Sequence, residues 1–147
     1  EIPLRLVGSE MCIRDRGWPE RVIMHCFSGG ADLARECVRH GAWLSFPGVL
    51  TFNNAERTRQ ALHATPVDKI LVETDAPFLT PHPRRGKRNG PYLIAHTIRF
   101  LSEQLDWDEA SCCEQLRRNT LAAYGGPWED VHGVTPLQLP ASGEETR

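Results

Sequence analysis

The sequence contains no long hydrophobic run, and its positive and negative charges nearly balance. No apolar stretch approaches the roughly 18 residues that a membrane-spanning helix requires. The formal net charge of the 147-residue chain is only -2, so the whole protein has no strong attraction to nucleic acid or to a membrane surface. We therefore expect a soluble protein that does not associate with membranes and in which any anion-binding surface is local.

Cysteine is present but lacks the spacing of disulfide frameworks and zinc sites. The chain contains five cysteines, an odd number, and no C-x-x-C pair. The adjacent residues Cys112 and Cys113 lie within a helical pattern. Because disulfides are rare in the cytosol and thiolate-bound zinc requires closely spaced pairs, we interpret the cysteines as reduced thiols and expect a cytoplasmic protein.

Composition and length indicate one globular domain. Hydrophobic residues make up 40% of the chain and charged residues 24%, without an internal repeat or a low-complexity tract. Residues 1–16 show neither the period of a helix nor that of a strand and resemble a translated sequencing adapter, so we expect an unrelated or artefactual leader. The alternative is a divergent connection between a helix and a strand. Residues 17–126 are the expected domain, and residues 127–147 are expected to form an irregular tail.

Short apolar runs alternate with amphipathic helical patterns along the chain. The predicted strands are residues 21–26, 42–46 and 69–74, and the predicted helices are residues 31–40, 55–63, 91–105 and 108–124. We expect Asn53 or Asn54 to cap the second helix and Asp106 or Asp108 to cap the last. Strands separated by helices imply right-handed parallel crossovers, so the predicted fold class is α/β with a parallel sheet.

Side chains that can bind a metal ion follow two of the predicted strands. His25 stands at the end of the first strand, and Asp75 directly follows the third. Because parallel strands present their carboxyl ends at one edge of the sheet, we expect both side chains to face a common pocket. Imidazole nitrogen and carboxylate oxygen are ligands of hydrolytic Zn, Mn or Mg sites. Taken alone, each residue is more often structural, as a hydrogen-bonded histidine or an aspartate that caps a turn.

A second carboxylate and a cationic loop lie near these residues in the sequence. Glu73 precedes Asp75 by two positions, so on a strand both point to one face, and Glu73 can support the site as an outer-shell residue. An ion pair at the strand edge is the alternative. The only dense cationic run follows in a proline-rich loop, and its Arg85, Lys87 and Arg88 suit phosphate oxygens. A solvated loop without a ligand is equally compatible with the charge pattern.

Three motifs carry a resemblance to a known family. They are H-C-F-S-G at 25–29, E-T-D-A-P-F-L at 73–79 and R-G-K-R-N-G-P at 85–91. Together they resemble the TatD family of metal-dependent deoxyribonucleases. The first two motifs are highly specific, the basic loop is less so, and the resemblance covers residues 21–125.

The resemblance implies a (β/α)8 TIM barrel of the amidohydrolase type, whose last three strands would be the three predicted here. It also implies that His25 is a metal ligand and that Asp75 both binds metal and activates the attacking water. In the family, two divalent ions hold a phosphodiester and a water, so the implied reaction is two-metal hydrolysis of a DNA substrate. The identity of the metal, among Mg, Mn and Zn, stays open.

The sequence departs from the family in residues that matter for activity. It contains no His-x-His pair, which the family carries on its first strand, and no counterpart of the mid-barrel glutamate or the fifth-strand histidine. Gly90 stands where the family usually has an acidic residue. A barrel of this type needs roughly 250 residues, and a catalytic metal has about three protein ligands. We therefore expect the C-terminal part of such an enzyme, without its N-terminal strands and inactive by itself.

Two other interpretations stay open. The complete protein can be a related amidohydrolase that cleaves a C–N bond, since the basic loop favours phosphate without excluding that reaction. The chain can instead be a non-catalytic fragment that binds partners or does not fold stably, because three strands leave two open sheet edges. No obligate protein partner is evident from the sequence.

Overall fold

Helices and strands alternate in the part of the chain that the computed structural model describes, which is residues 18–125. The elements are β1 (Ile23–Met24), α2 (Ala31–Arg39), β2 (Trp43–Phe46), α3 (Glu56–Ala64), β3 (Ile70–Val72), α4 (Ile94–Leu105) and α5 (Glu109–Tyr124). Short 3-10 helices lie between them: η1 (Gly48–Thr51), η2 (Val67–Lys69) and η3 (Pro91–Leu93). The predicted leader, residues 1–16, and the predicted tail, residues 127–147, lie outside the described residues.

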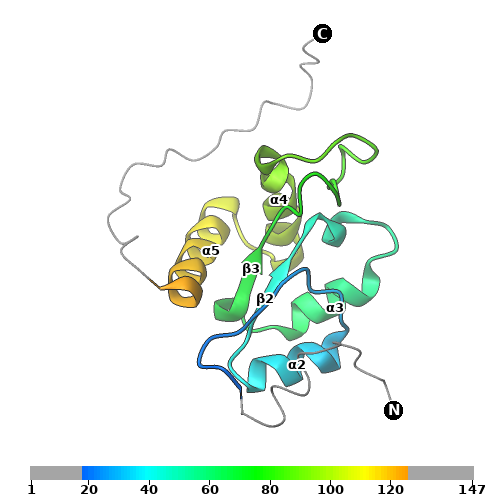
Figure 1. Ribbon diagram of the computed structural model, residues 1–147. Helices are drawn as coiled ribbons and strands as arrows, with labels where there is room; N and C mark the ends of the chain where they lie inside the picture. Colours follow the sequence, from blue (N-terminus) through cyan, green and yellow to red (C-terminus); the bar gives the residue numbers. More distant parts are fainter. Residues whose placement is uncertain (1–17, 126–147) are drawn as a thin grey trace.

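The strands form a three-stranded sheet in the order β1-β2-β3, with both neighbouring pairs parallel. Figure 1 shows β2 beside β3. Met24 is opposite Leu44, and Phe46 is opposite Val72, so the carboxyl ends of the strands meet at one edge. The predicted α/β class and the parallel topology are confirmed. They place the segments that follow β1 and β3 on the same side of the molecule.

The strands are shorter than the apolar runs that predicted them. The first predicted strand extended to Cys26, but β1 ends at Met24. Cys26 has a left-handed backbone with φ 49, which interrupts the extended conformation. The chain pairs with β2 again when the Phe27 N–H donates to the Ser45 carbonyl at 2.9 Å. Likewise, Lys69 belongs to η2 and not to β3. Because the chain turns at Cys26, His25 lies beyond the end of β1, at the edge of the sheet.

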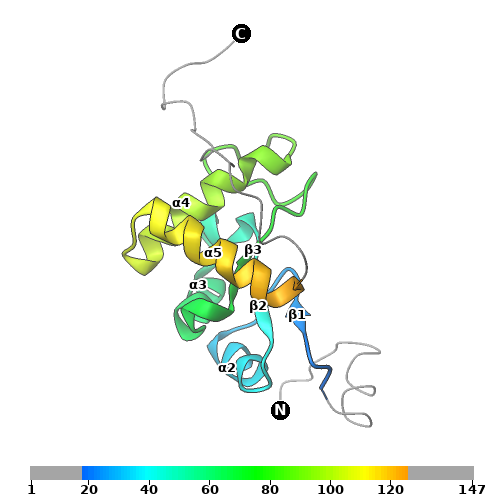
Figure 2. The same cartoon turned by 90° about the vertical axis from the view of Figure 1, so that its left-hand side faces the viewer.

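A single hydrophobic core lies between the sheet and the helices. Leu44 and Phe46 are two residues apart on β2, point to the same face and are both fully buried. All four α-helices contribute buried side chains to the cluster around them, including Ala34, Leu62, Leu101 and Leu116. Figures 1 and 2 show α2 beside α3 and α4 beside α5. Among the described residues, no helix has both the length and the hydropathy to cross a membrane.

One predicted helix cap is wrong and another is confirmed. The N-cap of α3 is Ala55, without a side-chain hydrogen bond, and neither Asn53 nor Asn54 caps the helix. The loop before α3 is instead held from the side by Arg59, whose guanidinium donates to the carbonyls of Leu50, Phe52 and Asn53. At α5 the Asp108 carboxylate accepts from the Ser111 N–H at 2.9 Å, as predicted.

Helix α4 packs on the core through one apolar face. Leu101 is buried in the core, and Ile98 and Leu105 pack against it, whereas Ile94 is not part of this cluster. Pro91 opens the 3-10 turn η3 directly before α4, consistent with its predicted place at a helix start. The proline-rich segment between β3 and η3 contains no regular helix or strand, in agreement with the loop prediction.

A buried asparagine ties the last helix to the last strand. Asn119 on α5 is 2% exposed, and its Nδ2 donates to the carbonyls of Val67 and Ile70, each at 2.7 Å. The Asn119 Oδ1 accepts from Gln115 Nε2 at 2.8 Å. These bonds satisfy one carbonyl of η2 and one of the first residue of β3, and thereby fix the strand that leads to Glu73 and Asp75.

Candidate metal centre

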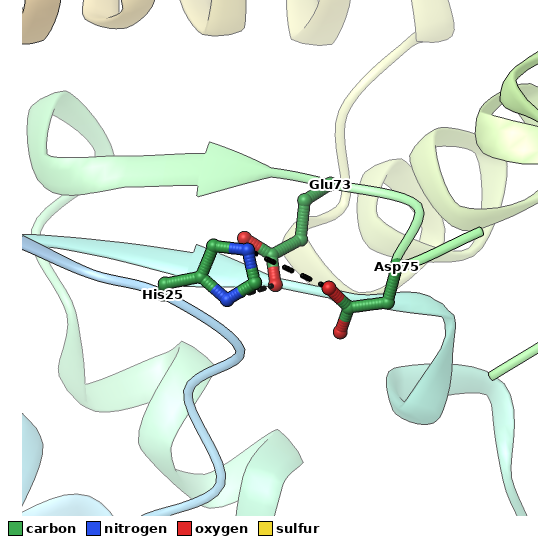
Figure 3. A group of neighbouring side chains, drawn as sticks. All are labelled: His25, Glu73 and Asp75. Atoms are coloured by element: carbon green, nitrogen blue, oxygen red, sulfur yellow. Dashed lines mark ion pairs between the residues drawn. The ribbon is translucent and has the colours of Figure 1, made fainter. Parts of the chain in front are cut away.

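Three side chains meet at the carboxyl edge of the sheet (Figure 3). His25 comes from the segment after β1, and Glu73 and Asp75 come from the segment after β3. His25 Nδ1 lies 3.4 Å from Glu73 Oε1, and His25 Nε2 lies 3.6 Å from Asp75 Oδ1. One ligand atom from each residue falls within 4.8 Å of the others. The structure therefore brings together His25 and Asp75, as the parallel topology led us to expect.

Glu73 joins the two outer strands of the sheet. Its Oε1 accepts from the Cys26 N–H at 2.7 Å, and its carboxylate also receives a hydrogen bond from the Ser45 side chain. The Glu73 N–H donates to the Phe46 carbonyl at 3.2 Å, which extends the β2–β3 pairing by one bond. These contacts hold the turn that carries His25 against the end of β3.

The sequence pattern placed Glu73 as an outer-shell residue, but its carboxylate lies inside the cluster. Its oxygen is as close to the imidazole as that of Asp75. The chain therefore offers three candidate ligands where the sequence had indicated two, His25 and Asp75. The i, i+2 spacing of Glu73 and Asp75 was the available signal, because it directs both carboxylates to one face.

The carboxylates are sheltered and the imidazole is open to solvent. The exposed fractions of the side chains are 15% for Glu73, 17% for Asp75 and 71% for His25. Burial raises the pKa of Glu73, and the nearby Asp75 charge adds to this rise, although hydrogen bonding from Ser45 opposes it. Two carboxylates of like charge in a sheltered position repel each other, and a bound cation offsets that repulsion. One imidazole and two carboxylates are a donor set that fits a divalent metal ion.

The neighbouring thiol of Cys26 contacts Asp75 and is not among the clustered candidate ligands. Burial raises the pKa of Cys26 to about 12, and a hydrogen bond and the negative charge from Asp75 contribute further. In the metal-free protein Cys26 is therefore protonated at neutral pH. Its thiol is hydrogen-bonded to Asp75 and helps to orient that carboxylate.

The cationic loop is anchored to the backbone of the metal-binding segment. The buried Asn89 side chain donates through Nδ2 to the Thr74 carbonyl at 2.6 Å and to the Phe78 carbonyl at 2.5 Å. The Thr80 hydroxyl donates to the Lys87 carbonyl at 2.7 Å. Thr74 stands between Glu73 and Asp75, so Asn89 fixes the loop to the backbone beside them. No sequence pattern predicts this role, since a single asparagine in a loop has no periodicity.

Arg85, Lys87 and Arg88 are exposed. The Arg85 guanidinium stacks on the Phe52 ring, with Cζ 3.7 Å from the ring centroid. Within residues 18–125, none of the three side chains forms an ion pair or a hydrogen bond with the metal cluster or with another acidic residue. Arginines on the helices do form ion pairs with glutamate or aspartate, namely Arg35, Arg39, Arg59, Arg99, Arg117 and Arg118. Among the residues that the structure describes, the positive charge of the loop is therefore uncompensated.

The sequence is similar to one protein family and to several proteins that are longer than this chain. The model of the family described as TatD related DNase matches residues 10–125. The Mycobacterium tuberculosis H37Rv protein named "uncharacterized metal-dependent hydrolase TatD" is 43% identical over 116 residues, which are 79% of this chain and 44% of that protein. A Bacillus subtilis 168 protein, "uncharacterized metal-dependent hydrolase YabD", is 48% identical over 81 residues, 55% of this chain and 32% of the relative. The chain thus spans less than half the length of these curated relatives.

Solved structures show the same fold. YJJV, a TatD homologue from Escherichia coli K12, superposes with a TM-score of 0.66 and 28% sequence identity over 71% of this chain and 40% of that one. A hydrolase TatD family protein from Entamoeba histolytica gives a TM-score of 0.61 over 70% of this chain and 42% of that one. At 14% identity the second comparison concerns the fold alone.

Proposed function

The chain belongs to the family of TatD-related DNases, and from this premise we propose that the complete protein is a metal-dependent hydrolase of DNA phosphodiester bonds. By the complete protein we mean this chain together with the additional length that its relatives have. The cluster of His25, Glu73 and Asp75 is the observation that carries the proposal. The family description names a DNase, and the relatives named above are metal-dependent hydrolases.

In this proposal the three clustered side chains would hold a divalent metal ion. Such an ion polarises a phosphoryl oxygen and lowers the pKa of a bound water. Asp75, sheltered and hydrogen-bonded to the Cys26 thiol, is placed to accept the proton of an attacking water. Glu73 links the segments that carry His25 and Asp75, so it keeps their side chains at the separation that a shared ligand requires.

The cationic loop supports a phosphate-containing substrate. Arg85, Lys87 and Arg88 have no counter-ion among residues 18–125, and guanidinium and ammonium groups suit phosphate oxygens. Stacking on Phe52 restrains the Arg85 guanidinium and leaves its N–H groups free to bind an anion. Asn89 connects this loop to the backbone between Glu73 and Asp75. The arrangement favours phosphodiester hydrolysis over cleavage of a C–N bond.

We further propose that this chain forms the last three strands of a (β/α)8 barrel and is inactive alone. The parallel sheet, the helices between its strands and the length of the relatives support this view. In residues 18–125, β1 and β3 each lack a partner on their outer edge, and the imidazole of His25 is largely open. Reading the gene further upstream tests the proposal: we expect a strand that carries a His-x-His pair, and its absence would refute both the barrel and the nuclease.

Activity is tested on the complete protein with single- and double-stranded DNA and either Mg²⁺ or Mn²⁺. We expect cleavage that a chelator abolishes. His25→Ala and Asp75→Asn should each lower the rate by more than the roughly 10- to 100-fold that loss of an outer-shell partner costs. His63→Ala, which changes an exposed histidine on α3, is the matched control and should leave the rate unchanged. Cleavage of cyclic amides without cleavage of DNA would instead establish the amidohydrolase alternative.

A further inference from the structure

Phe78 is the most exposed large hydrophobic side chain in residues 18–125, with 72% of its surface accessible. It stands three residues after Asp75, in the loop that follows the metal cluster. A single exposed hydrophobic side chain is common and by itself indicates nothing. The backbone of Phe78 is the unusual feature, because both its N–H and its carbonyl group are hydrogen-bonded within the protein.

Hydrogen bonds hold the backbone at Phe78 in place. The Phe78 N–H donates to the Asp75 carbonyl at 2.9 Å, and the Phe78 carbonyl accepts from Asn89 Nδ2. The next residue, Leu79, packs against η1 so closely that a Cβ at Gly48 would collide with its carbonyl oxygen. The exposure of the ring is therefore not explained by a loose loop. The loop is anchored, and it presents an aromatic face to the solvent.

In the sequence, Phe78 stands between the metal-binding residues and the cationic loop, on this anchored segment. The bond between Phe78 and Asp75 closes a four-residue turn, and such turns keep the first and last Cα atoms within about 7 Å. Asn89 lies in a loop directly after Arg88, and its side chain donates a hydrogen bond to the Phe78 carbonyl. An aromatic face, a metal cluster and uncompensated positive charge thus occur on one connected piece of backbone.

We propose that Phe78 positions the substrate by stacking against the nucleobase next to the scissile phosphodiester. This inference rests on the proposed function and names a contact that the metal cluster cannot make. Bases have an apolar face that stacks on aromatic side chains, and their phosphates suit nearby arginine and lysine. The charge of Arg85, Lys87 and Arg88 in the same loop favours a nucleic acid over an apolar protein segment as the partner of the ring.

The test uses single-stranded oligonucleotides and the complete protein with Mg²⁺ or Mn²⁺. Phe78→Leu keeps an apolar side chain but removes the aromatic face. Stacking of one base on an aromatic side chain contributes about 1–3 kcal/mol to binding, and we expect the lower end because one side of the ring stays solvated. This free energy corresponds to a rise in KM of about five- to tenfold, with little change in kcat. Phe78→Trp should restore the wild-type KM or lower it.

A matched control exists at the opposite end of the sheet. Tyr124 is also an exposed aromatic residue, and its carbonyl accepts from Arg21, which precedes β1. Tyr124→Leu should leave KM unchanged. Since the Phe78 ring makes little contact within residues 18–125, Phe78→Leu should also leave the melting temperature close to that of wild type.

Removing bases from the substrate distinguishes stacking from a general effect on the loop. A series of oligonucleotides, each with one abasic site near the scissile bond, should include one that raises KM for wild type about as much as Phe78→Leu does. With that oligonucleotide the KM of the variant should rise no further, because removing the base and removing the ring eliminate the same contact.

Four outcomes would overturn the inference. An unchanged KM in Phe78→Leu would contradict the stacking role without contradicting DNA hydrolysis. The same would follow if the abasic site raised KM equally in the variant and in the wild type. A large fall in melting temperature at unchanged KM would show that another part of the complete protein covers the ring. Absence of metal-dependent DNA cleavage by the wild type would overturn this inference together with the proposed function.

Discussion

Glu73→Gln is expected to have opposite effects on the stability of the metal-free protein and on its affinity for metal. The substitution preserves the shape of the side chain and an oxygen that can accept from the Cys26 N–H, but it removes the negative charge. In the native protein that charge is sheltered from water and lies beside Asp75.

Stability follows from the direction of the pKa shift. The pKa of Glu73 is raised in the folded protein, chiefly by burial and further by Asp75. A raised carboxyl pKa contributes stability that is complete below the unfolded-state pKa and is lost as the pH rises through the folded-state pKa. At neutral pH the ionised carboxylate therefore costs stability, and glutamine removes that cost. Without metal, Glu73→Gln should melt at or above the wild-type temperature at neutral pH, and any gain should shrink as the pH falls toward the ordinary range of glutamate.

Metal affinity should change in the opposite direction. The Glu73 oxygen is as near to His25 as the Asp75 oxygen is, so the variant loses a candidate ligand charge. Loss of an outer-shell partner alone costs about 10- to 100-fold in affinity, which corresponds to about 1.4–2.7 kcal/mol, and loss of a direct ligand should cost at least that much. Calorimetric titration of the complete protein with Mn²⁺ measures the affinity, and melting with Mn²⁺ or with a chelator measures the stability.

Glu103→Gln, the same substitution on the exposed surface of α4, is the control and should change neither quantity. A Glu73→Gln variant that binds Mn²⁺ as tightly as wild type but melts several degrees lower without metal would contradict the reasoning. Glu73 would then serve only as a link between the ends of β1 and β3.

Two further predictions concern the anchoring of β3 and the cationic loop. Asn119→Ala leaves the part-buried carbonyl of Val67 and the buried carbonyl of Ile70 without their side-chain donor, so chemical denaturation should show a loss of about 2–4 kcal/mol. Arg117→Ala, which removes an exposed ion pair of α5, should cost much less, and equal losses would contradict the role of Asn119. Lys87→Ala should weaken binding of single-stranded DNA and reduce the slope of log affinity against log salt by about 0.7, whereas Arg35→Ala, in which the lost cation is paired with Asp32, should leave the slope unchanged.

Local sequence pattern was sufficient for the order of the elements and for part of the site. The apolar runs around Ile23, Leu44 and Leu71 marked the strands, because a buried strand needs consecutive apolar residues. The alternation with helices implied parallel pairing, and parallel pairing placed His25 and Asp75 at one edge. Both inferences depend on neighbouring residues and on a topological rule, so they do not require knowledge of distant contacts.

Contacts between residues far apart in the chain decided the rest. Glu73 enters the cluster because the turn at Cys26, 47 residues earlier, brings an N–H group to its carboxylate. Arg59, and not Asn53 or Asn54, holds the loop before α3, because its long side chain reaches three carbonyls at once. Neither arrangement has a periodic signature that a sequence pattern can reveal.

The sequence by itself determined the class of the fold and two of the three clustered side chains. Tertiary structure alone decided that Glu73 is a candidate ligand, that Asn89 and Asn119 anchor the segments on either side of the site, and that the Phe78 ring faces solvent from a fixed backbone. The physical reason is that periodicity reports which face of an element is buried. Ligand geometry depends on side-chain positions that are set only when separate elements pack together.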